Sequence, residues 1–364
     1  MRVQNFLTGA LLSIASLSAV TALPFDNAVE GEQLEERAST IAVTGIQGQG
    51  QQVRMELRTM QQQHPDMFNI YLLGLQHMKQ VAQTNPLSYY AIAGIHGRPY
   101  VPYDGVTSPG GASGYGGGYC THVSNLFLPW HRPYLLLIEQ ELYNNVQAAV
   151  NTFPAGSAAR AKYQAAATNF RMPYWDWAAV PPAGAIPYPT LVSAGYVTVT
   201  TPSGQQSILN PLYRYDFNPL VASDFVYNPF ASWHVTLRDP TNFNDPGAAS
   251  QNNLIAPMIA NNAASLRDRL FNLFTNYDNF TEFGNEAWIN ANTVNADSLE
   301  SVHDLIHSLT GSNGHMTYLD YAAFDPIFWL HHTMVDRIFS MWQQLYPNTT
   351  LSRWPLSAAP TLTL

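Results

Sequence analysis

Apolar residues recur at helical spacing in separate stretches of the chain, and these stretches predict its main elements. The pattern predicts helices within residues 51–60, 68–83, 133–149, 298–309 and 325–345. Pro133 is expected in the first turn of its helix, where its missing N–H costs nothing.

The segments between these helices are predicted to be loops, with one hairpin among them. Pro86 ends the second helical stretch, and residues 94–118 are rich in glycine and proline. This segment is not a phosphate-binding loop, because no Lys-Ser/Thr follows it and no strand leads into it. Residues 178–265 are rich in Pro, Asn and Gly and are expected to be irregular, except for a hairpin at 196–208 that turns at 202–204. The pattern therefore predicts a mainly α fold with long loops and a small β-hairpin.

Composition narrows the class of protein. Apolar residues make up 46% of the 364 residues and charged residues only 11%, against a usual charged share of about 25%. A chain of this length and aromatic content (12%) can bury a large core. The net charge of -9 offers no basic surface, so nucleic acid is not an expected partner.

The N-terminal residues have the form of a targeting segment. Arg2 precedes an apolar stretch at 6–20, and small residues at 20–22 form a cleavage site, so residues 1–22 are expected to be a signal peptide. The stretch is too short, and too interrupted by Ser and Thr, to span a membrane, and no other stretch qualifies. Acidic residues before Arg37 suggest that residues 23–40 are a short pro-segment. We therefore expect a secreted, extracellular protein without a membrane anchor.

Two triplets have the form of N-glycosylation acceptors. They begin at Asn279 and Asn348. Such triplets are common by chance, but both fit the secretory route.

The eleven histidines are unevenly distributed. His303 and His307 are four residues apart on a predicted helix, which places them on one face, close enough to hold one ion. His331 and His332 are adjacent and point about 100° apart, so only one of them can face the same centre. The local pattern does not choose between them, because apolar neighbours flank both.

Three of the histidines before the middle of the chain form an earlier group, namely His96, His122 and His131. Together with the later group they suggest two metal sites that face each other, and helices with inward ligands are a normal way to build such sites. Imidazole suits copper, zinc or iron. The alternative for any single histidine is a core residue; it is preferred for His64, His77 and His234, and His315 stays open.

Two other metal sites fit part of the pattern. His303-Asp304-Leu-Ile-His307 differs in one residue from the zinc-protease motif, but its shorter Asp would place the carboxylate out of position for the base. Glu300-Ser-Val-His303 matches the Glu-x-x-His motif of di-iron bundles. Those bundles need a second copy, which the sequence does not contain. Both alternatives are therefore minor.

Taken together, the motifs resemble those of the fungal short-form tyrosinases and catechol oxidases. The matching segments are Cys120-Thr-His122, His131-Arg-Pro-Tyr134, His303-x-x-x-His307, Phe324-Asp-Pro-Ile-Phe-Trp-Leu-His-His-Thr-Met-Val-Asp-Arg337, Arg171-Met-Pro-Tyr-Trp-Asp-Trp177 and Gly314-His-Met316. The resemblance runs from about Gln51 to Tyr346. It implies a tyrosinase-like copper-binding catalytic domain at 41–346, with a central four-helix bundle that holds the copper site, and a C-terminal tail at 347–364.

The resemblance also implies a reaction and its ligands. Members use a type 3 dinuclear copper centre and O₂ to oxidise o-diphenols to o-quinones, and some act on monophenols or o-aminophenols. Copper A would be held by His96, His122 and His131, and copper B by His303, His307 and His332. Long members carry a C-terminal domain over the copper pocket, so a sequence that stops at Leu364 is expected to be a short, uncovered form. The alternative to an enzyme is a protein of a different class, an oxygen carrier of the haemocyanin type.

Further roles follow from the same resemblance. Cys120 occupies the position that forms a thioether with the second copper A ligand, here His122, which would remove a free thiol from the site. A small buried apolar residue is its alternative. Glu300 would orient a water near copper B and accept phenol protons; its alternative is a solvated helix residue. Asp304 is also expected to take part in catalysis. It occupies the position where several efficient monophenol hydroxylases carry Asn, so the resemblance does not decide whether monophenols are hydroxylated.

Substrate contacts are expected at two rings. Substrates of relatives stack on the second copper B histidine, here His307, and Phe328 lies one turn before His332. Ordinary core packing is the alternative for Phe328. Structural pairing is expected for Asp176, Asp336 and Arg337.

Overall fold

The computed structural model describes residues 40–106, 118–181, 185–289, 296–349 and 351. The predicted signal peptide, nearly all of the predicted pro-segment and most of the predicted tail lie outside these residues. The described residues from Ile41 onward belong to one compact unit.

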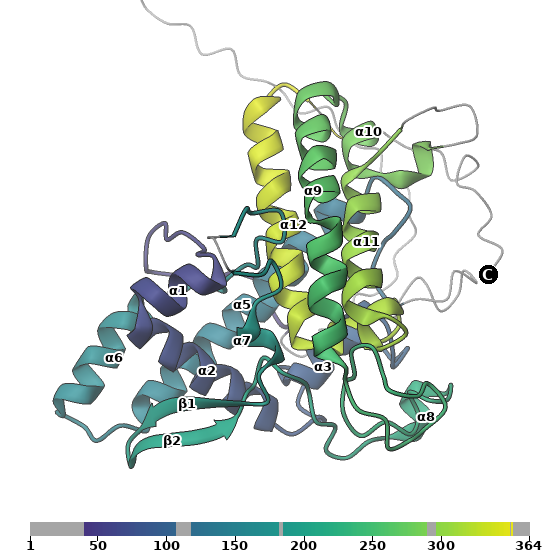
Figure 1. The fold of residues 1–364 in the computed structure, drawn as a ribbon. Coiled ribbons are helices and arrows are strands. Elements are labelled where there is room, and N and C mark those ends of the chain that lie inside the picture. Colours follow the sequence, from purple (N-terminus) through teal and green to yellow (C-terminus); the bar gives the residue numbers. More distant parts are fainter. Residues whose placement is uncertain (1–39, 107–117, 182–184, 290–295, 350, 352–364) are drawn as a thin grey trace, which may run out of the picture. The chain divides into compact units, whose positions relative to one another are not determined.

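Helices dominate this unit, as predicted (Figure 1). The α-helices are α1 (Leu57–Gln63), α2 (Pro65–Gln80), α3 (Tyr89–His96), α5 (Phe127–Asn151), α6 (Ala158–Thr168), α7 (Thr190–Ser193), α8 (Ala222–Phe225), α9 (Asn252–Asn276), α10 (Phe280–Gly284), α11 (Leu299–Gly311) and α12 (Pro326–Leu345). Three short 3₁₀ turns are η1 (Glu286–Trp288), η2 (His315–Thr317) and η3 (Ala322–Phe324). None of the helices in the described ranges is both long and apolar enough to cross a membrane.

The starts of α11 and α12 follow from local chemistry. The hydroxyl of Ser298 accepts a hydrogen bond from the N–H of Ser301 at 3.1 Å, and the carboxylate of Asp325 accepts one from Ile327 at 3.0 Å. A Ser or Asp cap satisfies an N–H that the first helical turn leaves unpaired. Pro326 occupies the first position of α12, where proline is tolerated. The predicted starts of both helices were therefore correct to within a residue.

Four helix predictions were wrong. The helix predicted within 51–60 begins only at Leu57. Helix α5 begins at Phe127, so Pro133 lies inside the helix rather than in its first turn. Helix α3 extends to His96, three residues into the segment predicted as loop. Helix α9 occupies part of the stretch predicted as irregular. Its buried residues, which include Ile255, Ile259 and Leu266, keep helical spacing, but the many Asn residues and Pro257 obscured that pattern.

The helices that carry the predicted ligands contact one another in sequence. Helix α3 packs on α5, α5 on α12 and α12 on α11, while α9 packs along α11. Figure 1 shows α9, α11 and α12 side by side. Helices α2 and α5 pack closely at Gly74, where an added Cβ would lie 2.8 Å from the Cα of Val146. The result is a helical core whose ligand-bearing segments converge.

The predicted hairpin is confirmed. Strands β1 (Tyr196–Thr201) and β2 (Gly204–Leu209) pair antiparallel, with Tyr196 opposite Leu209 and Thr201 opposite Gly204. Gly204 has a φ of +99°, which glycine adopts without steric cost. The side chain of Asn69 on α2 anchors the hairpin, since it accepts from the N–H of Thr200 at 2.7 Å and donates to its carbonyl at 3.0 Å.

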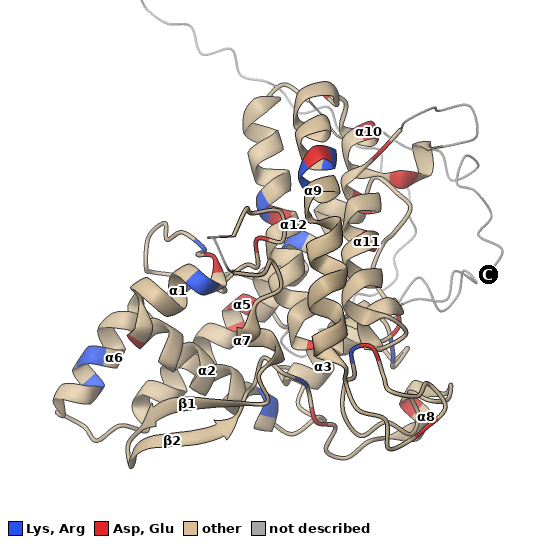
Figure 2. Ribbon diagram, viewed as in Figure 1, with Lys and Arg blue, Asp and Glu red and all other residues tan. Residues whose placement is uncertain are grey.

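A buried ion pair fixes the start of α12. The guanidinium of Arg238 and the carboxylate of Asp325 approach to 2.6 Å, and their side chains are 1% and 0% exposed. Arg238 also donates to the carbonyls of Val192 and Leu212, so its donors are used. This pair ties the long loop region to the helix that carries His331 and His332. Charged positions are otherwise sparse along the ribbon (Figure 2).

Candidate metal centre

The six predicted ligands come from four helices and one loop. His96 ends α3, His122 lies in the loop before α5, His131 is in α5, His303 and His307 are on α11, and His332 is on α12. All are buried except His122, which is half-buried. Residues far apart in the sequence therefore meet inside the core.

Backbone carbonyls orient three of the rings. The Nδ1–H groups donate to Leu319 O at 3.0 Å from His96, to Phe127 O at 2.7 Å from His131, and to Met316 O at 2.8 Å from His307. A donating Nδ1 leaves the Nε2 lone pair available, which is the tautomer that a metal ligand needs.

The Nε2 atoms of the later group converge. Nε2 of His332 lies 3.2 Å from that of His303 and 3.1 Å from that of His307. Two ligands about 2.0–2.1 Å from one ion at a tetrahedral angle lie roughly 3.3 Å apart. The spacing of the three nitrogens therefore fits a single ion.

The earlier group meets the later one at His332. Nε2 of His131 lies 3.4 Å from that of His96, and the rings of His131 and His332 stack with centroids 4.7 Å apart. One candidate set of ligand atoms joins His96, His131 and His332, and another joins His303, His307, His331 and His332. The two triplets thus lie face to face rather than apart.

The choice between His331 and His332 is now constrained by geometry. His332 approaches two other ligands through Nε2, whereas the ring of His331 stacks on His303 at 5.1 Å and borders Trp177 at 6.2 Å. No described residue accepts from or donates to either ring nitrogen of His331. His332 is therefore the better third ligand, and His331 lies at the margin of the same cluster.

Burial keeps these imidazoles neutral. Burial lowers the pKa of His96 to about 3 and lowers the pKa values of His122, His131, His307 and His332 well below their ordinary range. Neighbouring imidazoles add to the effect, since a positive charge on one disfavours a charge on the next. Neutral nitrogen donors are the state in which histidine binds copper, zinc or iron.

Cys120 lies beside the earlier triplet. Its Sγ and ligand atoms of His96 and His122 lie within 4.8 Å of one another, and burial raises the pKa of the thiol. The N–H of Tyr119 donates to Ile95 O at 2.9 Å, which holds the cysteine loop against the end of α3. The sulfur is therefore close to the predicted thioether partner.

Glu300 is not a solvated helix residue, because its side chain is fully buried. Its Oε1 accepts from the N–H of Val123 at 2.6 Å and its Oε2 from that of Glu286 at 3.0 Å. Val123 follows His122 and has a φ of +53°, which is rare for a β-branched residue. Burial raises the pKa of Glu300 well above its usual value, and the two N–H donors oppose part of that rise. Glu300 thereby holds the backbone beside a predicted ligand.

Asp304 contacts His303 directly. Its Oδ1 lies 2.9 Å from Nδ1 of that ring, and its side chain is 47% exposed. Burial by itself raises the pKa of Asp304, but the hydrogen bond from His303 and the nearby imidazoles outweigh it, so the pKa is lowered. Burial and the negative charge of Asp304 raise the pKa of Glu286 to about 7. Sequence reasoning missed Glu286, because only the fold brings η1 against α11.

Phe328 lies beneath the imidazoles. Its ring stacks on His332 at a centroid distance of 4.0 Å and lies 4.8 Å from His96 and 5.8 Å from His307. The side chain is 0% exposed, so it supports the ligands from the core side. His307, at 8%, is the most exposed of the five buried ligands. A contact of either ring with substrate stays a prediction.

The other singled-out residues have structural surroundings. Asp336 pairs with Arg54 at 2.9 Å and with Arg132 at 2.5 Å, and Arg337 lies 3.8 Å from Asp176, in line with the expected pairing. Nδ1 of the buried His315 accepts from the N–H of Leu237 at 3.0 Å, and its ring packs among Phe217, Phe230 and Trp233. His315 is a core residue.

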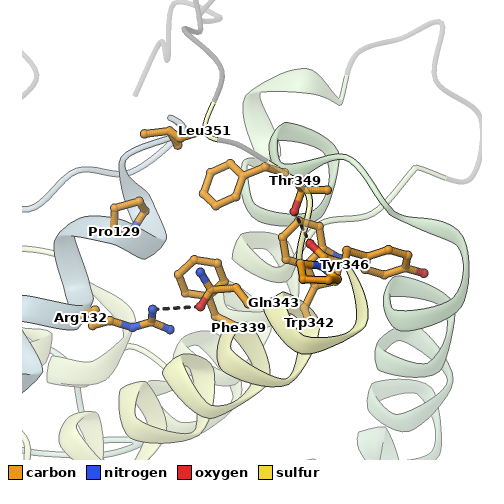
Figure 3. A pocket seen from close by; sticks show the side chains of 10 residues that line it. Pro129, Arg132, Phe339, Trp342, Gln343, Tyr346, Thr349 and Leu351 are labelled. Carbon is orange, nitrogen blue, oxygen red and sulfur yellow. Dashed lines mark hydrogen bonds between the residues drawn. The ribbon is translucent and has the colours of Figure 1, made fainter. Parts of the chain in front are cut away.

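Two surface hollows lie apart from the histidines. One, of about 340 Å³, lies between the start of α5 and the end of α12 and is lined by Phe339, Trp342 and Tyr346 (Figure 3). Its Arg132 donates to Gln343 at 2.9 Å and to Asp336, so the charge is already neutralised. The other, of about 380 Å³, borders α3. No histidine lines either of them.

Two face-to-face triplets of imidazoles in a helical core are typical of a dinuclear metal protein with nitrogen ligands. Comparison with protein families identifies which one. Residues 86–345 match the common central domain of tyrosinase, so the chain belongs to the tyrosinase family. The resemblance drawn from the motifs is confirmed.

Individual relatives agree. The chain is 45% identical over 313 residues to a tyrosinase of Neurospora crassa, covering 83% of this chain and 45% of that protein, and 44% identical over 310 residues to one of Podospora anserina, covering 83% and 53%. A crystal structure of latent and active mushroom tyrosinase superposes with a TM-score of 0.76 at 31% identity, covering 87% of this chain and 80% of the other. The chain spans about half the length of the curated relatives named here.

Proposed function

We propose that the protein oxidises phenols, in the first place o-diphenols to o-quinones, with O₂ as the acceptor at a dinuclear copper centre. The observation that carries the proposal is the meeting of the two histidine triplets at His332. Its ring stacks on that of His131 with centroids 4.7 Å apart, and its Nε2 lies 3.2 Å and 3.1 Å from those of His303 and His307. Membership of the tyrosinase family supports the choice of reaction.

The residues present fit a pair of copper ions. The donors are imidazole nitrogens, a ligand type that copper favours. The buried Nδ1 atoms of His122 and His332 have no hydrogen-bond partner among the described residues. The Nε2 atom of His332 instead lies 3.2 Å and 3.1 Å from those of His303 and His307, a spacing that one ion can bridge. Copper A would be held by His96, His122 and His131, and copper B by His303, His307 and His332.

The surrounding residues set up the chemistry. When bound, the copper pair exchanges electrons with O₂ and with the phenol. Fixed Nδ1 hydrogen bonds keep His96, His131 and His307 in the neutral tautomer, and Phe328 excludes water from beneath the rings. The half-exposed Asp304 and its neighbour Glu286 are placed to accept a phenol proton, since a pKa of about 7 suits a proton acceptor near neutral pH.

We also propose the thioether between Cys120 and His122. Its formation removes the thiol hydrogen of Cys120 and one ring hydrogen of His122, a two-electron oxidation for which O₂ would be the oxidant. It is supported by the position of Sγ, within 4.8 Å of the ligand atoms of His96 and His122. The bond would fix the ring of the half-buried ligand, which has no hydrogen bond at Nδ1 to orient it. It would also remove a thiol that copper and oxygen would otherwise oxidise.

Secretion is part of the proposal. The pattern of residues 1–22 supports it, and the side chains of Asn279 and Asn348 are exposed, as glycosylation requires. Asn279 also caps α10 by accepting from the N–H of Thr281 at 2.9 Å.

The test is oxygen uptake with catechol by the copper-loaded protein, beside metal analysis. We expect two coppers per chain, quinone formation, and loss of both copper B and activity in His303→Ala. His77→Ala is the matched control, because His77 is exposed and lies outside the cluster. Reversible oxygen binding without quinone would indicate a carrier of the haemocyanin type, and zinc in place of copper would indicate a hydrolase. Comparing a monophenol, a diphenol and an o-aminophenol in the same assay would rank the substrates.

A further inference from the structure

The hollow of about 380 Å³ beside α3 is lined by many hydrogen-bond acceptors and few free donors. Prolines contribute much of its wall, namely Pro86, Pro99, Pro102 and Pro219. Proline has no backbone N–H, so these segments present carbonyl groups and apolar rings but no donor. Three tyrosines, Tyr90, Tyr103 and Tyr119, supply aromatic surface.

The donor groups of four side chains in this wall are already bonded within the protein, and Thr84 is the remaining lining side chain with a donor. The hydroxyl of Tyr90 donates to Asp224 at 2.6 Å, that of Tyr103 to Pro86 O at 2.9 Å, and that of Tyr119 to Val106 O. The side chain of Gln83 donates to Pro219 O at 2.8 Å. A ligand therefore finds few hydrogens to accept here.

The acceptors, in contrast, have capacity left. Two half-buried carboxylates, Asp104 and Asp224, are the only charged residues among the described residues that line the hollow. Asp104 accepts from the N–H of Ile41 at 2.6 Å, and Asp224 accepts from Tyr90. Counting the bonds from the described part of the chain, each retains capacity, because a carboxylate accepts about four hydrogen bonds. The hollow thus combines negative charge, aromatic faces and apolar surface, a combination that attracts organic ammonium groups.

We propose that this hollow is a second binding site, separate from the histidine cluster, for a small arylalkylammonium ligand. The ammonium group lies between the two aspartates, and the aromatic ring packs on the prolines and tyrosines. The hollow adjoins the histidine cluster through two neighbouring residues of its wall. Ile95 precedes His96, Tyr119 precedes Cys120, and the two are joined by a backbone hydrogen bond of 2.9 Å.

The probe is 2-phenylethylammonium, which has no phenolic hydroxyl for the proposed oxidation to act on. Binding is measured by calorimetry and by ligand-observed NMR on the copper-loaded chain. We expect a dissociation constant in the range of roughly 0.1–1 mM, because so few atoms limit the affinity. The matched probe 3-phenylpropionate has a similar ring and length but the opposite charge, and it should not bind or compete.

Variants locate the site. Asp224→Asn keeps an acceptor for Tyr90 but removes the charge, and it should weaken binding roughly 10-fold. Ala91→Leu fills the hollow and should abolish binding. The control Asp268→Asn makes the same change of charge at an exposed position of α9 outside the lining and should bind like the parent chain.

Two results would overturn the proposal. One is unchanged affinity in both Asp224→Asn and Ala91→Leu, with folding verified by thermal melting, because the ligand would then bind elsewhere. The other is equal binding of the anionic probe. His303→Ala should still bind 2-phenylethylammonium, because the hollow does not depend on copper. The binding test and the test of the proposed function can therefore fail independently of each other.

Discussion

Replacement of Glu300 by Gln separates two roles for this carboxylate. The fully buried Glu300 accepts two backbone N–H groups, one from Val123 beside His122 and one from Glu286. Glutamine has the same shape but offers one carbonyl oxygen and one NH₂ group. One of the two N–H groups would therefore face a donor and remain unpaired.

The expected cost follows from that loss. A hydrogen bond to a charged group contributes about 1.5–3 kcal/mol to stability, and leaving its buried partner unpaired costs a similar amount. At about 2 °C per kcal/mol for a unit of this size, the metal-free Glu300→Gln protein should melt roughly 3–6 °C below the parent. The loop of His122 should also loosen, because Val123 loses the contact that holds its unfavourable φ.

The assay is thermal melting of the metal-free chain, followed by measurement of the copper retained during dialysis against a chelator. Using the metal-free chain avoids stabilisation by bound copper. Glu282→Gln is the matched control, since Glu282 is exposed on α10. If Glu300→Gln melts within about 1 °C of that control and keeps its copper while turnover falls, Glu300 acts as a proton acceptor and not as the support of the His122 loop.

Three other residues give independent predictions. After copper loading, the intact mass should be two hydrogens lower than the mature sequence requires, and Cys120 should resist alkylation even when denatured; a labelled thiol would contradict the thioether. Burial lowers the pKa of His315 to about 4 from an ordinary 6.5, so its contribution to stability is complete above pH 6.5 and declines as the pH falls towards 4. At pH 5 the loss is about 2 kcal/mol, and His315→Phe should reduce the difference in unfolding free energy between pH 7 and pH 5 by that amount; an unchanged difference would refute the assignment. Asp325→Asn preserves the helix cap but leaves the buried Arg238 without its counter-charge, so urea unfolding of the metal-free chain should show a loss of roughly 3–5 kcal/mol; a loss below about 1 kcal/mol would show that the pair is not needed for stability.

The sequence predicted the helices whose ends carry strong local signals. Ser298 and Asp325 cap helices with regular apolar spacing, and both starts were placed correctly. Where composition opposed the spacing, the prediction failed. Helix α9 contains Pro257 and several Asn residues, and it is stabilised by burial of one face rather than by local propensity.

For the ligand histidines too, the sequence predicted one part of the arrangement and the fold decided the rest. The four-residue spacing of His303 and His307 is enough to place both on one face of their helix. The sequence pattern did not decide whether His331 or His332 is the third ligand of the later group. The two are adjacent, and the spacing along a helix does not say which side of that helix faces the core. Packing of α12 against α5 and α11 decides that point by bringing His332 within 3.2 Å of His303 and 4.7 Å of the ring of His131.

The sequence by itself therefore determined the kind of chemistry, since residue types and short spacings are local properties. It identified the histidines, the cysteine two residues before His122 and the carboxylate three residues before His303. Only the tertiary structure decided what these groups contact. The bond from Val123 to Glu300 joins residues 177 positions apart, and Glu286 reaches Asp304 across the packing of η1 on α11. Such contacts depend on how buried surfaces fit together, and no local pattern of residues encodes that fit.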